Sequence, residues 1–380
     1  MLDSGVTILR IRGVPIKIHW TLLLLLPLLA TSVANQFGAY AQALGVQPES
    51  LTLPVWLWGI FLAIGVFVGI LLHELAHALV ALRSGGKIHS IVLMMLGGVT
   101  RIREQGRPER EAWMAFAGPL TSFAIALVSW LVYRLAPLAP DARIAALVFA
   151  GINLTLAVFN LLPAFPMDGG RILRGLLVRR MGRMGATHVA TTVSKWIAAA
   201  LALYGLLSFN LLLVAIAAFV YMGAQGERAK LESHDILHGM TVGALMVTDR
   251  VGEVHAGEPM AAAGKLLLRG NLEGARVVAD PPGDSSHLHH RTIGIVTTRE
   301  LIERAHQGAA AAPVETAMHT DLPTVHREDD ASRTLDALAA GEAPAVVVVD
   351  RDDEVIGLIT TGDILRALEL AKLSREPSRG

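Results

Sequence analysis

The stretch that decides the fold is residues 55–82, VWLWGIFLAIGVFVGILLHELAHALVAL. It is apolar over more than the roughly 20 residues that cross a hydrocarbon core of about 30 Å, so it predicts a transmembrane helix. Within it stand the ionisable side chains of His73, Glu74 and His77. Such groups are costly inside a membrane, and they usually face protein or water and carry a function. This stretch therefore predicts both a membrane fold and a site inside it.

Five further apolar runs are long enough to be transmembrane spans. The six runs together are Ile18–Ala34, Val55–Leu82, Ala112–Leu135, Arg143–Leu162, Thr187–Leu207 and Leu211–Gln225. The last two are divided at residues 208–210 because one helix of their combined length would exceed the bilayer thickness. The first run also has the features of a cleavable signal peptide, since basic residues precede it and residues 32–34 resemble a cleavage site. The later spans predict a membrane protein in either case.

Charge divides the chain into two parts. Overall the 33 basic and 33 acidic residues balance, but residues 1–230 carry 19 basic and 9 acidic side chains and residues 231–380 carry 14 and 24. In the first part, the basic residues gather before span one, between spans two and three, and after span four. By the positive-inside rule this places both termini in the cytoplasm. The pattern predicts a membrane domain followed by an acidic soluble domain, and it argues against a uniformly basic nucleic-acid binder.

The spacing of the two histidines in span two predicts a metal site. Side chains four residues apart on a helix project from one face, so His73 and His77 can share one cation. Glu74 is adjacent but turned aside, where it can take a proton from water during hydrolysis. The chain has no cysteine, which leaves histidine and carboxylate as the strong ligands. The alternative is a buried polar cluster that joins helices.

Asp168 offers a third ligand. It ends the segment 160–168, NLLPAFPMD, in which Pro163 and Pro166 prevent helix continuation, while the glycines that follow permit a tight reversal. We therefore expect an extended segment that presents Asp168 on the cytoplasmic side, at the depth of the two histidines. The alternative is that Asp168 is the N-cap of a helix over residues 171–180, because aspartate is a favoured N-cap residue.

These motifs resemble those of the site-2 protease family, the zinc metalloproteases that cut substrates within the membrane. The resemblance covers most of residues 1–228. It rests on HELAH at 73–77 and on NLLPAFPMDG at 160–169, which matches the family pattern N-x-x-P-x-x-P-[LM]-D-G. Both defining motifs are present, so the resemblance is specific.

The resemblance implies a role for each matching residue. It implies one zinc ion held by His73, His77 and Asp168, with Glu74 as general base and later general acid. It also implies that Asn160 positions the substrate or stabilises the tetrahedral intermediate.

Two further segments resemble parts of the same family. Residues 88–101 are too short to span a membrane and rich in β-formers, and they resemble a membrane-associated hairpin that could pair with an extended substrate. The alternative is an interfacial loop. Residues 117–122 resemble a family motif that often ends in asparagine, so Ser122 is a departure from the pattern.

A repeat follows the membrane spans. Residues 293–301, IGIVTTREL, parallel residues 356–364, IGLITTGDI, and each repeat reads as strand, helix, strand, strand, helix. Over about residues 241–370 this resembles a pair of CBS domains, which are nucleotide-sensing modules. The resemblance implies that Thr360 and Asp363 hold the ribose of an adenine nucleotide such as ATP, ADP or AMP, and it raises the prospect of a homodimer through these domains. The alternative is that Asp363 is an acid at a helix N-terminus, where the helix dipole favours a negative charge with or without a ligand. The first repeat departs from the pattern, because Glu300 stands where the second has Asp363.

The expected fold class is a multi-span α-helical membrane protein with about six transmembrane helices and a cytoplasmic α/β tandem CBS domain. The expected domains are a transmembrane metalloprotease domain at 1–228, a linker at 229–240, CBS repeats at 241–305 and 312–370, and a tail at 371–380. The expected function is a zinc-dependent intramembrane endopeptidase of a prokaryotic cell membrane. It would cut membrane-anchored regulatory proteins in or near their transmembrane segment, under control by nucleotide.

Two other functions are weighed against this one. A CBS-regulated metal-ion transporter would need polar groups near the bilayer midplane and the outer face, whereas the predicted ligands cluster at the inner edge. A catalytically silent scaffold is disfavoured because Glu74 and all three predicted ligands are intact.

Overall fold

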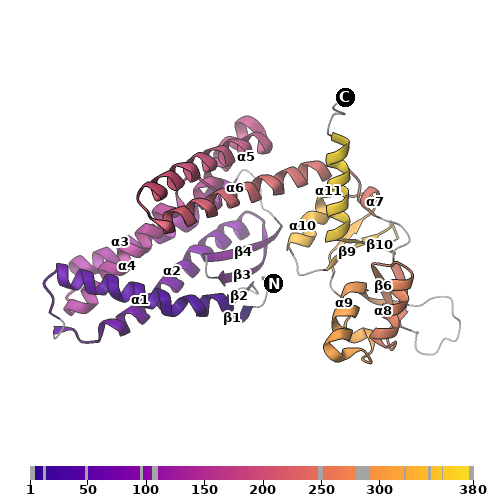
Figure 1. The fold of residues 1–380 in the computed structure, drawn as a ribbon, viewed down its shortest axis with the longest axis horizontal. Helices are drawn as coiled ribbons and strands as arrows, with labels where there is room; N and C mark the ends of the chain where they lie inside the picture. Colours follow the sequence, from indigo (N-terminus) through magenta and orange to yellow (C-terminus); the bar gives the residue numbers. More distant parts are fainter. Residues whose placement is uncertain are drawn as a thin grey trace. The chain divides into compact units, whose positions relative to one another are not determined.

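The computed structural model describes residues 5–11, 14–47, 50–94, 97–104, 110–246, 251–279, 291–320, 322–340, 344–352 and 354–375. The chain forms two compact units, Met1–Leu231 and Glu232–Gly380 (Figure 1). The boundary lies within a helix, so the residues expected to form a linker at 229–240 begin as the last turns of that helix.

The first unit contains six helices that are long and apolar enough to cross a membrane, as the hydropathy pattern predicted. They are α1 (Trp20–Ala43), α2 (Val55–Arg83), α3 (Glu111–Leu135), α4 (Pro140–Asn160), α5 (Asp168–Leu207) and α6 (Leu211–Leu237). Large apolar side chains such as Leu24, Phe123 and Trp196 are exposed on them. In water this would be unfavourable, but it suits helices whose outer faces contact lipid tails.

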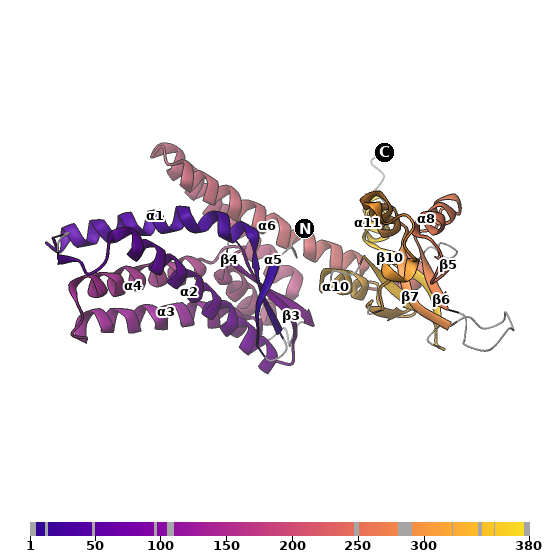
Figure 2. The ribbon, with the colours of Figure 1, turned by 90° about the horizontal axis from the view of Figure 1, so that it is seen from below.

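Helices α1 to α4 pack as a bundle, with α2 against α1, α3 and α4 (Figure 2). Glycines on α2 allow the close approach to α4. A Cβ at Gly65 would lie 3.2 Å from the ring of Phe149, and one at Gly69 would lie 2.9 Å from Asn153 Oδ1. These small residues let α2, whose C-terminal half carries the two histidines, pack closely against α4.

Helix α5 differs most from its predicted span. It begins at Asp168 rather than at Thr187, and Gly182, with φ of 70° and ψ of 172°, interrupts its helical backbone. The basic stretch after Asp168 is thus the first part of α5, and only the part after Gly182 corresponds to the predicted fifth span. Helices α5 and α6 are separate, as expected. The chain reverses between them at Phe209, which has a φ of 50°.

A four-stranded sheet completes the first unit. Its strands are β1 (Gly5–Ile11), β2 (Val14–His19), β3 (Lys87–Met94) and β4 (Gly97–Glu104), in the order β1-β2-β3-β4. The segment predicted as a hairpin is β3 and β4, so the interfacial-loop alternative is wrong. Strands β1 and β2 were not predicted from the sequence, and β2 pairs with β3 in parallel. Strand β4 is an edge of this sheet, where an extended peptide could add a strand.

The second unit contains the predicted repeat. The first repeat comprises β5 (Val251–His255), α8 (Met260–Arg269), β6 (Gly274–Ala279), β7 (Arg291–Thr297) and α9 (Thr298–Arg304). The second comprises β8 (Thr324–His326), α10 (Ser332–Ala340), β9 (Ala345–Val349), β10 (Val355–Thr360) and α11 (Thr361–Arg375). In both repeats the first and second strands pair in parallel and the second and third pair antiparallel. The two repeats therefore share one topology.

Short helices and the end of α6 complete this unit. These helices are α7 (Val242–Leu245), η3 (Ala305–Ala309) and η4 (Val314–Thr316). Ile236 and Leu237, at the end of α6, are buried in the apolar core of the second repeat, where they pack with residues such as Val348 and Ile359.

Candidate metal centre

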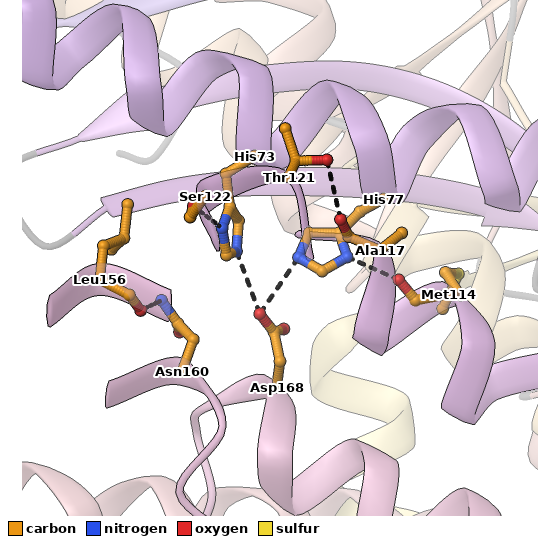
Figure 3. A network of polar contacts seen from close by, with 9 residues as sticks. All are labelled: His73, His77, Met114, Ala117, Thr121, Ser122, Leu156, Asn160 and Asp168. Carbon is orange, nitrogen blue, oxygen red and sulfur yellow. Dashed lines mark hydrogen bonds and ion pairs between the residues drawn. The ribbon is translucent and has the colours of Figure 1, made fainter. Parts of the chain in front are cut away.

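Helix α2 directs two imidazoles towards one point (Figure 3). The ring centroids of His73 and His77 are 4.8 Å apart. The Nε2 atom of His73 lies 3.1 Å from Asp168 Oδ2, and the Nε2 atom of His77 lies 3.2 Å from the same oxygen. His73 is 4% exposed and Asp168 is 8% exposed. Asp168 thus meets His73 and His77, which precede it by more than 90 residues in the sequence, inside the unit.

The turn between α4 and α5 places Asp168 there. Phe165 is fully buried, and its backbone N–H donates to Ser194 Oγ at 2.8 Å. A Cβ at Gly170 would lie 2.7 Å from the backbone of Ala164 and Phe165, so the first turn of α5 packs directly on this segment. The N-cap of α5 is Met167, and Asp168 is its first helical residue. The segment expected to be extended is instead a series of turns and bends over residues 161–167, and the alternative of an aspartate N-cap was wrong.

Helix α3 contacts the Nδ1 atoms of both imidazole rings. Ser122 Oγ lies 2.9 Å from His73 Nδ1, and the backbone oxygen of Met114 lies 2.7 Å from His77 Nδ1 (Figure 3). Gly118 stands between these two residues on the same face of α3. A Cβ there would lie 2.5 Å from His73 Nε2 and would overlap His77 Nε2. The sequence predicted none of these three contacts.

The donor set fits a zinc ion. Two imidazole nitrogens and a carboxylate oxygen are ordinary zinc ligands, and on a tetrahedral ion with bonds of about 2.0–2.1 Å they would stand about 3.3 Å apart. The two nitrogen–oxygen distances, 3.1 and 3.2 Å, are close to that separation. A buried carboxylate is also costly unless a cation or hydrogen bonds compensate it. Asp168, His73 and His77 could therefore hold the metal.

Glu74 and Asn160 differ in how their side chains are directed relative to this cluster. A carboxylate oxygen of Glu74 lies within 4.8 Å of a ring nitrogen of each histidine. Asn160 is the last residue of α4, and its Nδ2 donates to the backbone oxygen of Leu156 at 3.0 Å (Figure 3). The structure thus brings Glu74 to the cluster, while the amide of Asn160 is directed to its own helix.

A buried ion-pair network lies close to the centre and was not predicted. Arg174, in the first part of α5, is 8% exposed and pairs with Glu111 at the start of α3 and, at 2.8 Å, with Glu227 on α6. Its guanidinium also lies over the Phe165 ring, 5.0 Å from the centroid. In the sequence, Arg174 is one of the basic residues that follow span four and were expected to lie in a connection between spans. In the structure its ion pairs link α3, α5 and α6.

In the second unit, Thr360 and Asp363 interact at the start of α11. Asp363 Oδ2 accepts from the backbone N–H of Thr360 at 2.9 Å and from its hydroxyl at 2.7 Å. Asp363 Oδ1 is buried and has no hydrogen-bond partner among the described residues, although Arg366 lies 3.6 Å from it. In the first repeat the corresponding Glu300 makes a similar capping box with Thr297, but its other oxygen contacts His319 Nε2 at 2.5 Å. The two repeats therefore differ at this position.

Comparison with known proteins finds similar proteins for both units. The model of peptidase family M50 matches residues 61–139 and 139–204, and the CBS domain model matches residues 314–370. The zinc metalloprotease MJ0392 of Methanocaldococcus jannaschii is 29% identical over 99% of both chains, and the putative zinc metalloprotease MJ0611 of the same organism is 32% identical over 29% of this chain and 68% of its own length. The solved site-2 protease from Methanocaldococcus jannaschii is 34% identical and matches 59% of this chain and 95% of its own, with a TM-score of 0.41.

The chain belongs to peptidase family M50. This M50 peptidase is a metalloendopeptidase of the site-2 protease type and an integral membrane protein, and it carries a CBS domain in its second unit. The resemblance deduced from the two motifs and the repeat is thereby confirmed.

Proposed function

We propose that this M50 peptidase is a zinc-dependent intramembrane endopeptidase that cuts membrane-anchored regulatory proteins in or near their transmembrane segment. The observation that carries the proposal is the convergence of His73 Nε2, His77 Nε2 and Asp168 Oδ2 inside the helical bundle. These three side chains would hold one zinc ion per chain. Family membership supports this function over the alternative of a metal-ion transporter.

Zinc, when bound, supplies a Lewis acid that polarises water and the peptide carbonyl. Glu74 would take the proton from the attacking water and later deliver it to the leaving amine, because its carboxylate lies within 4.8 Å of a ring nitrogen of each histidine while Asp168 supplies the third ligand. Asn160 would contact the substrate after its amide turns away from Leu156. Peptide hydrolysis needs water, so the surrounding helices would have to shield the site from lipid while they admit water to it.

The test of this function is Glu74→Gln. Glutamine keeps the shape of the side chain but cannot accept the proton, so the variant should retain zinc while cleavage falls by about 10²–10⁴-fold. Zinc is measured by elemental analysis of the purified protein, and cleavage by membrane proteomics that looks for single-span fragments that accumulate uncut. The exposed Glu315→Gln is the matched control. Undiminished cleavage by Glu74→Gln would rule out the proposed role.

We also propose an adenine-nucleotide site in the second repeat of the second unit. Asp363 has a buried oxygen without a hydrogen-bond partner among the described residues, so a ribose hydroxyl could bind there, with Thr360 beside it. In the first repeat the equivalent oxygen of Glu300 already contacts His319. We therefore infer one nucleotide per chain, whether ATP, ADP or AMP, and we propose that its binding regulates cleavage.

The number of nucleotides bound per chain tests the proposed nucleotide site. Equilibrium dialysis of the full chain in detergent with radiolabelled AMP should give one nucleotide per chain, and Asp363→Asn should lower the affinity at least tenfold. Glu300→Gln is the control and should leave binding unchanged. A stoichiometry of two, or equal binding by Asp363→Asn, would contradict the assignment.

The proposal also covers the side of the membrane on which the termini lie, the type of membrane, and the oligomeric state. We propose a prokaryotic cell membrane with both termini in the cytoplasm, and the gathering of basic residues in alternate connections supports this orientation. A homodimer through the CBS domains is the expected assembly, and analytical ultracentrifugation of the full chain in detergent would test it.

A further inference from the structure

The two metal-facing imidazoles have different partners on α3. Histidines that bind a metal usually donate their second ring N–H to a neighbouring acceptor, which fixes the tautomer and the ring orientation. Here Nδ1 of His77 meets a backbone carbonyl, that of Met114, whereas Nδ1 of His73 meets a side-chain hydroxyl, that of Ser122. Only the second of these partners can be changed by substitution.

The chemistry of the partners decides how firmly each tautomer is set. A carbonyl can only accept, so the Met114 oxygen requires a proton on His77 Nδ1 and leaves Nε2 with a free lone pair. A hydroxyl can accept or donate, so Ser122 sets the same tautomer of His73 only when it accepts from Nδ1–H. Ser122 is fully buried, and its hydroxyl makes this contact away from bulk water.

The register of α2 against α3 makes these contacts possible. Met114, Gly118 and Ser122 are each four residues apart, so they share one face of α3, opposite the His73–His77 face of α2. Gly118 leaves open the space between the two Nε2 atoms, which a Cβ would fill. The hydroxyl of Ser122 therefore reaches His73 without a bulky neighbour displacing the ring.

We propose that Ser122 is a positioning residue that holds His73 in the tautomer and orientation needed to bind zinc. The inference rests on the proposed function, because it requires that His73, His77 and Asp168 hold the metal. It assigns Ser122 a role that acts through His73, with no contact to the substrate.

The experiment measures metal affinity rather than cleavage. Ser122→Ala removes one oxygen atom, and zinc affinity should fall 10–100-fold, the usual effect of losing such a partner. With cobalt in place of zinc, the visible absorption bands of Ser122→Ala should shift. Ser122→Thr keeps a hydroxyl and should bind zinc close to the wild-type affinity.

Thr121 provides a matched control. It is the neighbouring hydroxyl on α3, but its Oγ1 donates to the Ala117 backbone oxygen at 2.9 Å within its own helix (Figure 3). Thr121→Val should therefore leave zinc affinity and the cobalt spectrum unchanged. Wild-type affinity in Ser122→Ala, or an equal loss in Ser122→Ala and Ser122→Thr, would overturn the proposal.

The proposed function can fail separately from this inference. If the wild-type chain holds one zinc and His73→Ala holds none, the site is supported whatever Ser122 does. If the wild-type chain and His73→Ala hold equal amounts of zinc, the proposed function fails first.

Discussion

Gly118 shows how one missing side chain shapes the candidate centre. It lies on α3 against the nitrogen atoms of both histidines that face Asp168. It stands inside α3 directly before Pro119, where the proline ring disfavours a Cβ on a helical residue. A Cβ would also fill the space between the two Nε2 atoms, which is where the proposed zinc ion would lie.

Gly118→Ala should therefore abolish zinc binding and cleavage while the chain remains folded. Alanine favours a helix over glycine by about 1 kcal/mol, but a Cβ is disfavoured before Pro119, so the two effects on helix stability oppose each other. Gly151→Ala on α4 is the control, because a Cβ there meets nothing within 4 Å. Zinc content and circular dichroism of the two purified variants check the prediction. Normal zinc content in Gly118→Ala would mean that the metal is held elsewhere.

At the scale of elements, the centre depends on the packing of α2, α3 and α5. Helix α2 supplies both imidazoles, α5 supplies the carboxylate from its first residue, and α3 supplies the contacts behind the rings. Arg174 joins the start of α3 to α5 and α6 through its two ion pairs. This network therefore stabilises the packing of α3 against α5, two of the helices that form the candidate metal site.

Arg174→Met should destabilise the protein strongly. Removing one partner of a buried ion pair costs about 3–5 kcal/mol, because the remaining charges stay buried without compensation, and here two carboxylates would face each other. Methionine fills much of the volume, so lost packing contributes little. Thermal unfolding in detergent measures the effect, with the exposed Arg179→Met as control. Equal midpoints for the two variants would show that the network contributes no stability.

At the scale of the whole molecule, one helix connects two units of different character. The first unit is a helical bundle with apolar outer faces, and the second is a pair of αβ repeats with small apolar cores. Helix α6 begins among the membrane helices, and its last residues are buried in the second repeat.

The orientation of the whole chain can be tested with single cysteines, since the natural sequence has none. A membrane-impermeant maleimide should label Gln47→Cys, between α1 and α2, on intact cells. It should label Arg351→Cys, in the second unit, only after lysis. Both positions are exposed. The opposite labelling pattern would place the termini outside the cytoplasm.

The sequence by itself determined the features that depend on neighbouring residues. The six spans follow from runs of apolar residues, and the shared face of His73 and His77 follows from a spacing of four on one helix. The repeat in the second unit is visible as two similar segments of nine residues. Each of these features is local, so each can be deduced before any tertiary contact is known.

Only the tertiary structure decided which residues surround the two histidines. Ser122 and the Met114 carbonyl come from another helix. A contact with a backbone oxygen cannot be predicted from residue type, because every residue has one. Arg174 looks like a loop charge until Glu111 and Glu227 are brought to it from two other helices. Asp168 became the first residue of α5 because the buried turn at Phe165 lets the helix begin there. Packing between distant segments decides these positions, and no local pattern records it.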